Sequence, residues 1–282
     1  MDEGRRVREG AGRMLNVIVD DTRDPARNLA LDEALGRVAD RRPTASPVLR
    51  VWQNAPSVLV GRFQNVAAAV DLAACARDDV RIVRRATGGE AVHTDHGTLC
   101  FTLVHRQDPC QARGHSARAG GRPVPRPRAG YARAPYPRPG ARPDLDVLVA
   151  TAVEEFGLPA AALRDGSVVQ AARLRTRGAS LTHVAVHVAP RSPDGPGYVT
   201  PAGASTARRT LADLGVEVTL DAVRAAVLSV IVDEYGIACT RCPDADERAL
   251  RDDLHARRYG DAGWHLNGTR AARGERREFT GR

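Results

Sequence analysis

The sequence predicts an α/β domain. Runs rich in β-branched residues, several of them alternating between apolar and polar positions, recur up to residue 105 and are typical of strands. Longer segments with helical periodicity lie between and after these runs, without a strict β-α-β rhythm. With 282 residues, 43% of them hydrophobic, the chain can bury a normal core in one large domain or two small ones.

Each element is predicted from its own stretch of sequence. Strands are predicted where β-branched and alternating residues cluster, at 14–20, 48–53, 57–63, 81–85 and 98–105. Helices are predicted at 28–39, 145–156, 220–235 and 246–258. The last two helices follow Thr219 and Asp244, whose side-chain oxygens can accept hydrogen bonds from the first helical turn.

Composition excludes several protein classes. No window approaches the roughly 18 consecutive apolar residues of a membrane span. Residues 1–10 are charged and have no apolar core, so we expect no secretory signal and a cytoplasmic location. Five irregularly spaced cysteines then predict reduced thiols and no disulfide framework.

One segment, residues 107–142, differs from the rest in composition. It holds eight arginines against one acid, Asp108, and seven of the 18 prolines. Such a composition cannot pack a core, so we interpret it as a flexible insertion in a domain spanning 14–266, between a flexible start at 1–13 and a basic tail at 267–282. Its charge could attract an acidic partner, but a solvated loop is the simpler interpretation, and sparse aromatic residues argue against nucleic acid.

A loop between two predicted strands carries the strongest functional signal. Two arginines, a Gly-Gly turn and an Asp-x-Gly sequence stand close together there, and backbone N–H groups and fixed positive charge on such a loop could surround one anion. The residues concerned are Arg84, Arg85, Gly88, Gly89, Asp95 and Gly97. The loop therefore predicts an acyl-adenylate or phosphate pocket.

The segments around this loop make the pattern specific. Asn28–Leu35, Trp52 and Gly61–Asn65 precede the loop in the order and spacing of the lipoate-protein ligase A and octanoyltransferase catalytic domain, which this chain resembles. Further matches are Ala172, Arg177-Gly178, Leu181, His183 and the closing segment Arg258–Trp264. The resemblance implies a mixed central β-sheet flanked by helices, as in biotin ligases, without a C-terminal accessory domain.

The resemblance also implies an activity. Such enzymes attach lipoate or octanoate to a lysine of a lipoyl carrier domain, as in 2-oxoacid dehydrogenases or the glycine cleavage protein, through an acyl-adenylate made with ATP and Mg²⁺ or from an acyl thioester. No nucleic acid or membrane partner is expected. The acyl group would enter beside Gly88 and Gly89, and Arg84 or Arg85 would hold its phosphate or carboxylate. Arg62 and Gln64 are predicted at the pocket rim, Asp95 and Gly97 preserve the loop, and His183 is a binding candidate.

Departures from the family pattern leave alternatives open. The family uses a catalytic lysine, whereas this chain has none: all 42 basic residues are arginine. Counting back from His183 places Ser167 at the lysine position and Gln170 at a glycine position. Glu90 replaces a third loop glycine and brings a charge that opposes nucleotide binding. The alternatives to a ligase are a non-catalytic member that binds an acyl group or a carrier domain, and a condensation with another amine.

Other reactive residues have simpler interpretations. His183 and His187 lie four apart in a predicted strand and share a face, but two histidines without a third ligand are usually structural, so no metal site is predicted. Cys100 lies in an apolar strand, where a cysteine behaves as a small hydrophobic residue. Asp32 and Glu33 point about 100° apart on a helix and do not converge on one site.

Overall fold

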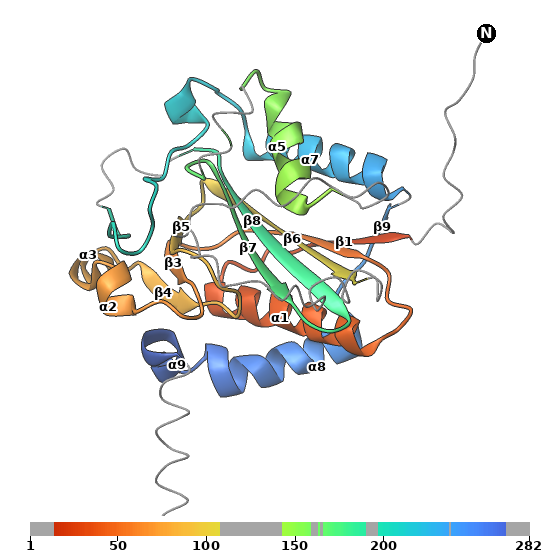
Figure 1. The fold of residues 1–282 in the computed structure, drawn as a ribbon, viewed down its shortest axis with the longest axis horizontal. Helices are drawn as coiled ribbons and strands as arrows, with labels where there is room; N and C mark the ends of the chain where they lie inside the picture. Colours follow the sequence, from red (N-terminus) through yellow and green to blue (C-terminus); the bar gives the residue numbers. More distant parts are fainter. Residues whose placement is uncertain are drawn as a thin grey trace, which may run out of the picture.

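The computed structural model describes residues 14–107, 143–158, 163, 166–189, 197–236 and 238–268. The expected flexible start at 1–13, nearly all of the insertion at 107–142 and the tail beyond residue 268 lie outside this range. The described chain forms two sheets and the helices packed on them (Figure 1).

The main sheet has six strands in the order β7-β8-β6-β2-β1-β9. β1 pairs in parallel with β2 and with β9, and the pairs β2-β6, β6-β8 and β7-β8 are antiparallel. The predicted α/β class with a mixed sheet flanked by helices is therefore confirmed. The strand bounds are Leu15–Val19 (β1), Val48–Trp52 (β2), Thr98–Arg106 (β6), Val169–Arg175 (β7), Ala179–His187 (β8) and Ala238–Thr240 (β9).

A second sheet of three strands carries the arginine-glycine loop. β3 (Ser57–Val60) lies between β4 (Arg81–Arg84), its parallel partner, and β5 (Val92–Thr94), its antiparallel partner. The predicted strand at 57–63 ends at Val60, because the chain turns at Gly61. A Cβ at Gly61 would lie 2.0 Å from the carbonyl oxygen of Gly89, so this close approach requires glycine.

Helices cover both faces of the main sheet (Figure 1). α5 (Leu145–Glu154) and α7 (Leu220–Tyr235) pack on one face, and α1 (Pro25–Arg41) with α8 (Ala245–Leu254) packs on the other. Alternate residues of β6 point to opposite faces of the sheet. Phe101 packs in the core beneath α5 and α7, whereas Cys100 packs in the cluster on the α1 side. The remaining short helices are α2 (Val66–Ala69), α3 (Leu72–Arg77), η2 (Ala212–Leu214), η3 (His255–Tyr259) and α9 (Ala262–Asn267).

Local capping explains where the helices begin. α7 spans 220–235 as predicted, and the hydroxyl of Thr219 accepts a hydrogen bond from the Ala222 N–H at 3.1 Å. α1 begins at Pro25, before the predicted start at residue 28, because the carboxylate of Asp24 accepts from the Ala26 N–H at 2.8 Å.

Asp244 begins α8 with a reciprocal pair of bonds. Its carboxylate accepts from the Glu247 N–H at 2.9 Å, and the Glu247 carboxylate accepts from the Asp244 N–H at 2.7 Å. We expect Asp244→Ala to lower the free energy of unfolding by about 1 kcal/mol in urea denaturation. Asp244→Asn keeps an N-cap oxygen and should retain most of that stability. Equal losses in both variants would instead attribute the effect to the ion pair with Arg42.

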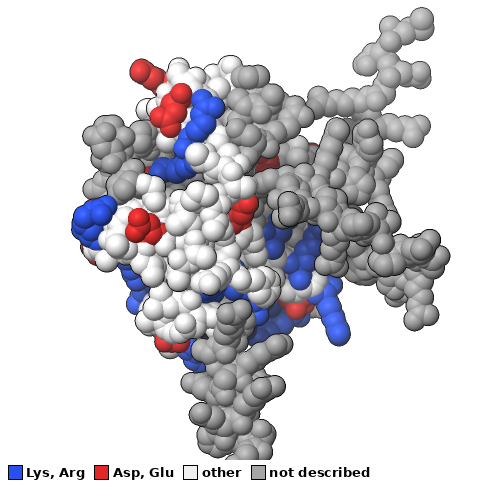
Figure 2. Space-filling model, turned by 60° about the vertical axis from the view of Figure 1, so that its left-hand side comes forward, with Lys and Arg blue, Asp and Glu red and all other residues white. Residues whose placement is uncertain are grey.

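The described surface carries dispersed charge. In the view of Figure 2 much of the middle of the face is uncharged apart from isolated acidic side chains, and basic side chains lie mostly toward its edges. Among the described residues no helix is both long and apolar enough to span a membrane. The described cysteines, Cys75, Cys100, Cys239 and Cys242, are free thiols.

Candidate functional site

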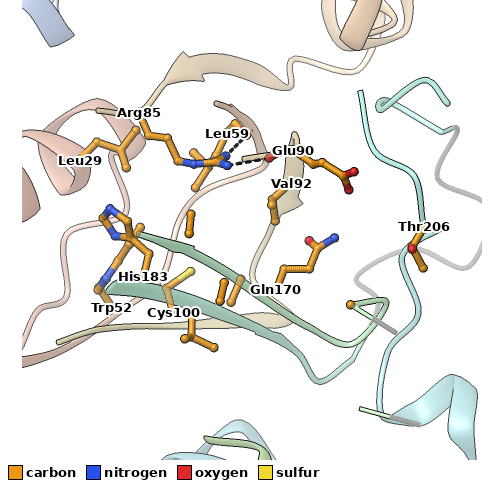
Figure 3. Close-up of a pocket in the computed structure, with 15 residues that line it drawn as sticks. Leu29, Trp52, Leu59, Arg85, Glu90, Val92, Cys100, Gln170, His183 and Thr206 are labelled. Carbon is orange, nitrogen blue, oxygen red and sulfur yellow. Dashed lines mark hydrogen bonds between the residues drawn. The ribbon is translucent and has the colours of Figure 1, made fainter. Parts of the chain in front are cut away.

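A pocket opens between the main sheet, α1 and the second sheet (Figure 3). One part of its wall is apolar and contributed by Leu29, Trp52, Leu59, Val92 and Ala185. The other part, which we call the mouth, is polar and contributed by Glu90, Gln170 and Thr206. A site with one apolar and one polar end suits an amphiphilic ligand such as a fatty acid.

His183 lies in the apolar part and is held by a buried carboxylate. Its Nδ1 lies 2.9 Å from Oδ2 of Asp32 on α1. The same carboxylate accepts from Arg50 at 2.7 Å and from the Thr102 hydroxyl at 2.7 Å, and Thr102 accepts from the Trp52 indole at 2.9 Å. The network therefore joins α1 to three strands directly behind the pocket.

Asp32 remains ionised although it is fully buried. Burial alone would raise the pKa of this carboxyl, but the Arg50 charge and the hydrogen bonds from His183 and Thr102 outweigh burial and lower the pKa. Glu33, its neighbour in sequence, bonds instead to Arg258 at 2.7 Å. The prediction that the two carboxylates do not converge is confirmed.

Arg85 lies on the pocket wall, and its guanidinium is hydrogen-bonded to carbonyls of β3 and of its own loop. Nη1 donates to the carbonyl of Leu59 at 2.8 Å, and Nη2 donates to that of Glu90 at 2.7 Å (Figure 3). Nη2 also donates to the carbonyl of Gly88 at 2.8 Å. Gly89 has φ +97°, a conformation that favours glycine. Arg85 therefore shapes the loop at the pocket.

Arg84, which we expected to hold an anion, points elsewhere. It is not among the described residues lining the pocket, and only 1% of its surface is exposed. Its guanidinium donates to the carbonyls of Gly61 at 2.9 Å, Trp264 at 3.1 Å and Leu266 at 3.1 Å. With its donors turned toward these carbonyls, Arg84 fastens the closing segment to the second sheet.

The expected rim residues, Arg62 and Gln64, lie in the turn after β3, beyond the end of the strand at Val60. The Gln64 amide accepts from the Gly61 N–H at 2.9 Å and donates to the Gly203 carbonyl at 2.7 Å. The Arg62 guanidinium lies 5.6 Å from the centre of the Phe63 ring. Neither Arg62 nor Gln64 is among the described residues that line the pocket.

Asp95 and Gly97 lie at the base of the loop. The Asp95 carboxylate accepts from the Gly97 N–H at 2.9 Å and pairs with Arg208 at 3.0 Å. A Cβ at Gly97 would lie 1.4 Å from the Ala189 carbonyl oxygen, so only glycine fits. Both residues therefore hold the loop against neighbouring chain, and neither is among the described lining residues.

The β7 region contains the two positions where the family pattern is lost. Ser167 is 1% exposed, its carbonyl accepts from the Arg209 N–H at 3.1 Å, and its neighbour Gly166 lines the pocket. Gln170 lines the pocket mouth directly. A polar side chain thus reaches the site from a position where a glycine was expected.

The remaining reactive candidates behave as small or neutral groups. Burial raises the pKa of the Cys100 thiol well above its ordinary value, although Cys100 lines the pocket. His183 and His187 share a face of β8, as predicted, but His183 bonds to Asp32 and His187 bonds to Arg208. Within the described ranges, no group of three or more His, Cys, Asp or Glu residues could hold a metal ion.

Two important residues were missed or undervalued in the sequence. Arg208 contacts Asp95 and His187, but it lies far from both along the chain and has no local signal. For Asp32 the sequence predicted only that it does not converge with Glu33, although its carboxylate holds His183 at the pocket. The position of Asp32 beside a family-matched histidine could have been inferred only from the packing of α1 on the sheet.

Comparison with known proteins agrees with this architecture. The family model described as the lipoyl protein ligase A/B catalytic domain matches residues 24–119. A T. acidophilum protein with bound lipoic acid is 20% identical, with a TM-score of 0.68, over 90% of this chain and 100% of that chain. Lipoate-protein ligase A bound with ATP is 21% identical, with a TM-score of 0.67, over 90% of this chain and 98% of that chain. A bi-partite lipoate protein ligase from Thermoplasma acidophilum, studied with its E2 lipoyl domain, is 22% identical. Its TM-score is 0.65, over 90% of this chain and 96% of that chain.

The structural matches, all below 25% identity, establish the fold, and the family model covers α1, the second sheet and the arginine-glycine loop. Residues 24–119 therefore match the lipoyl protein ligase A/B catalytic domain, and the described chain has the fold of the lipoate-protein ligases.

Proposed function

We propose that the protein binds a medium-chain carboxylic acid, lipoate or octanoate, and transfers it as an activated acyl group to a lysine of a lipoyl carrier domain. The observation that carries this proposal is the pocket, whose apolar part suits an alkyl chain and whose mouth holds the Gln170 amide and the Thr206 hydroxyl, two groups able to bond a carboxyl group. Burial of the alkyl chain would contribute about 0.8 kcal/mol per methylene.

ATP is the proposed activating substrate, with Mg²⁺ bound to its phosphates. The Arg85-ordered loop supports this proposal, because its glycines let backbone approach a phosphate. Since the described residues include no cluster suited to a metal, the phosphates themselves would supply most of the ligands of Mg²⁺. If the acyl group came instead from an acyl thioester, neither ATP nor Mg²⁺ would be needed.

A non-catalytic acyl-binding protein is the second candidate, and two observations favour it. The chain has no lysine to contact the acyl carbonyl and the phosphate. The Glu90 carboxylate lies at the mouth, where it accepts from the Ser205 N–H at 3.1 Å and would repel a triphosphate. Both features leave the apolar part of the pocket unaffected.

The test is carrier acylation by purified protein with ATP, Mg²⁺ and lipoate or octanoate, measured from the intact mass of an apo lipoyl domain. A mass increase equal to one acyl group supports the ligase. Ala185→Leu, which puts a larger side chain into the pocket, should abolish it. If the parent protein gives no increase but Glu90→Gly or Ser167→Lys does, the chain is an acyl-binding relative that has lost its catalyst. No increase in any variant, with octanoate still bound, also supports the second candidate.

A further inference from the structure

Gln170 lies where the pocket meets a second polar cluster. On β7 it pairs with Ala185 of β8, and its side chain shares the sheet face that lines the pocket mouth. His187, two residues beyond Ala185 on the same face, lies beside it. The orientation of the Gln170 amide therefore depends on which ring nitrogen of His187 carries a proton.

Arg208 determines the protonation of His187. The Arg208 Nε donates to His187 Nδ1 at 3.0 Å, and a guanidinium can only donate hydrogen bonds. His187 Nδ1 must therefore be unprotonated. Burial, together with the Arg208 charge, lowers the pKa of His187 well below its ordinary value, so the ring is neutral and its single proton lies on Nε2.

This tautomer determines how the glutamine amide is turned. His187 Nε2 lies 3.2 Å from Oε1 of Gln170, and an Nε2–H group needs an acceptor, which the amide oxygen provides. The amide NH₂ group is then the end of Gln170 that is turned away from His187. Because Gln170 lines the mouth, this group can donate to a ligand there.

We propose that Gln170 is a hydrogen-bond donor to the carboxylate or carbonyl oxygen of the acyl ligand, with His187 and Arg208 as the residues that position it. The identity of the ligand rests on the function proposed above. Part of the task of the absent lysine would thereby pass to a neutral amide, which donates without charge. The charged donor on this wall, Arg85, has its Nη atoms on the carbonyls of Leu59, Gly88 and Glu90.

The first test is the affinity of the full-length protein for octanoate, measured by calorimetry without ATP. Gln170→Leu removes the donor and should weaken binding about tenfold, and Gln170→Glu places a negative acceptor there and should weaken it about 100-fold. Gln170→Lys restores a donor and should bind at least as tightly as the parent. Lysine cannot accept from His187, so preserved binding in this variant rules out a purely structural role for Gln170.

The second test examines the positioning residues. In His187→Phe the amide can turn either end toward the ligand, so the preference for octanoate over octylamine should fall by about fivefold or more. The matched variant is Gln170→Leu/His187→Phe, in which the histidine substitution should have little further effect on this preference. An unchanged preference in His187→Phe would contradict the positioning role.

These measurements separate the proposed donor from the proposed reaction. If the affinity for octanoate decreases from Lys through Gln and Leu to Glu at position 170, and no carrier is acylated, the result upholds the donor and contradicts the ligase. Carrier acylation with equal octanoate affinity in all four proteins upholds the ligase and overturns the donor. Absence of octanoate binding by the parent protein overturns the donor as well.

Discussion

Arg50→Met should destabilise the protein by about 3–5 kcal/mol, measured as the free energy of unfolding in urea at pH 7. The Arg50 side chain is fully buried on β2, and it pairs with Asp32 at 2.7 Å and with Asp20 at 2.8 Å. Methionine approximates the aliphatic part of arginine but leaves the Asp32 charge buried without its cation. The expected loss is therefore dominated by an uncompensated buried charge.

The dependence of this loss on pH distinguishes the charge from simple packing. Without Arg50, burial should raise the pKa of Asp32 above its ordinary range, and the folded variant would then bind a proton that the unfolded chain releases at neutral pH. Acidification toward pH 5 should therefore reduce the difference between variant and parent. The double variant Arg50→Met/Asp32→Asn should also recover part of the loss. A difference independent of pH, with no recovery in the double variant, would indicate a packing defect.

The elements with complete local signals were predicted well from the sequence. α7 matches its predicted range because its Thr219 cap lies within the same stretch as its periodicity. β6 extends only one residue beyond its predicted range, because its apolar run is long and continuous. The α8 segment is similar, except that the final turn from His255 to Tyr259 is a π-helix. Local signals of this kind do not depend on tertiary packing.

β7 shows why other elements escaped prediction. Its sequence, VQAARLR, is rich in alanine and arginine, which favour helices, and it forms a strand by pairing with β8. The short strands β5 and β9 have three residues each, too few for a pattern. In these segments the tertiary partner decides the conformation.

The candidate site divides in the same way. The family pattern led to Arg85 and His183, which line the pocket, because their neighbours in sequence carry the motif. The pattern could not distinguish Arg84 from Arg85, since the choice depends on which guanidinium meets the closing segment around Trp264. Arg208 contacts His187 and Asp95, which are distant from it in sequence, so these contacts could be identified only from the folded structure.

Acidification should destabilise the protein between pH 6.5 and pH 4, because two histidines are held neutral around Arg208. Burial and then the Arg208 charge lower the pKa of His93 to about 4, and the same causes lower that of His187 well below its ordinary value. His93 Nδ1 accepts from Arg208 at 2.8 Å. The other neighbours are the Asp95 carboxylate, which opposes the shift in His93, and the uncharged groups of Thr98, Gln170 and Tyr198.

The sign follows from proton uptake. Below pH 6.5 the unfolded histidines bind protons that the folded histidines refuse, so the unfolded state gains protons and stability falls as pH decreases. Each histidine contributes at most about 1.4 kcal/mol per pH unit, and a total loss of roughly 2–4 kcal/mol is expected by pH 4.5. Ionised carboxylates with a lowered pKa, such as Asp32, lose their contribution to the free energy of unfolding only at lower pH. The two effects therefore occupy different pH ranges.

Urea denaturation at half-unit steps from pH 7.5 to pH 4.5 measures this slope directly, and amide substitutions assign it. His93→Gln/His187→Gln keeps acceptors for Arg208 but removes both titrating rings, so its stability should vary much less with pH. Some slope should remain from His265, whose pKa is also lowered by burial. A double variant with the full slope would place the acid sensitivity outside the Arg208 cluster. Loss of octanoate affinity over the same pH range in the parent protein, and not in the double variant, would link the cluster to the pocket through Gln170.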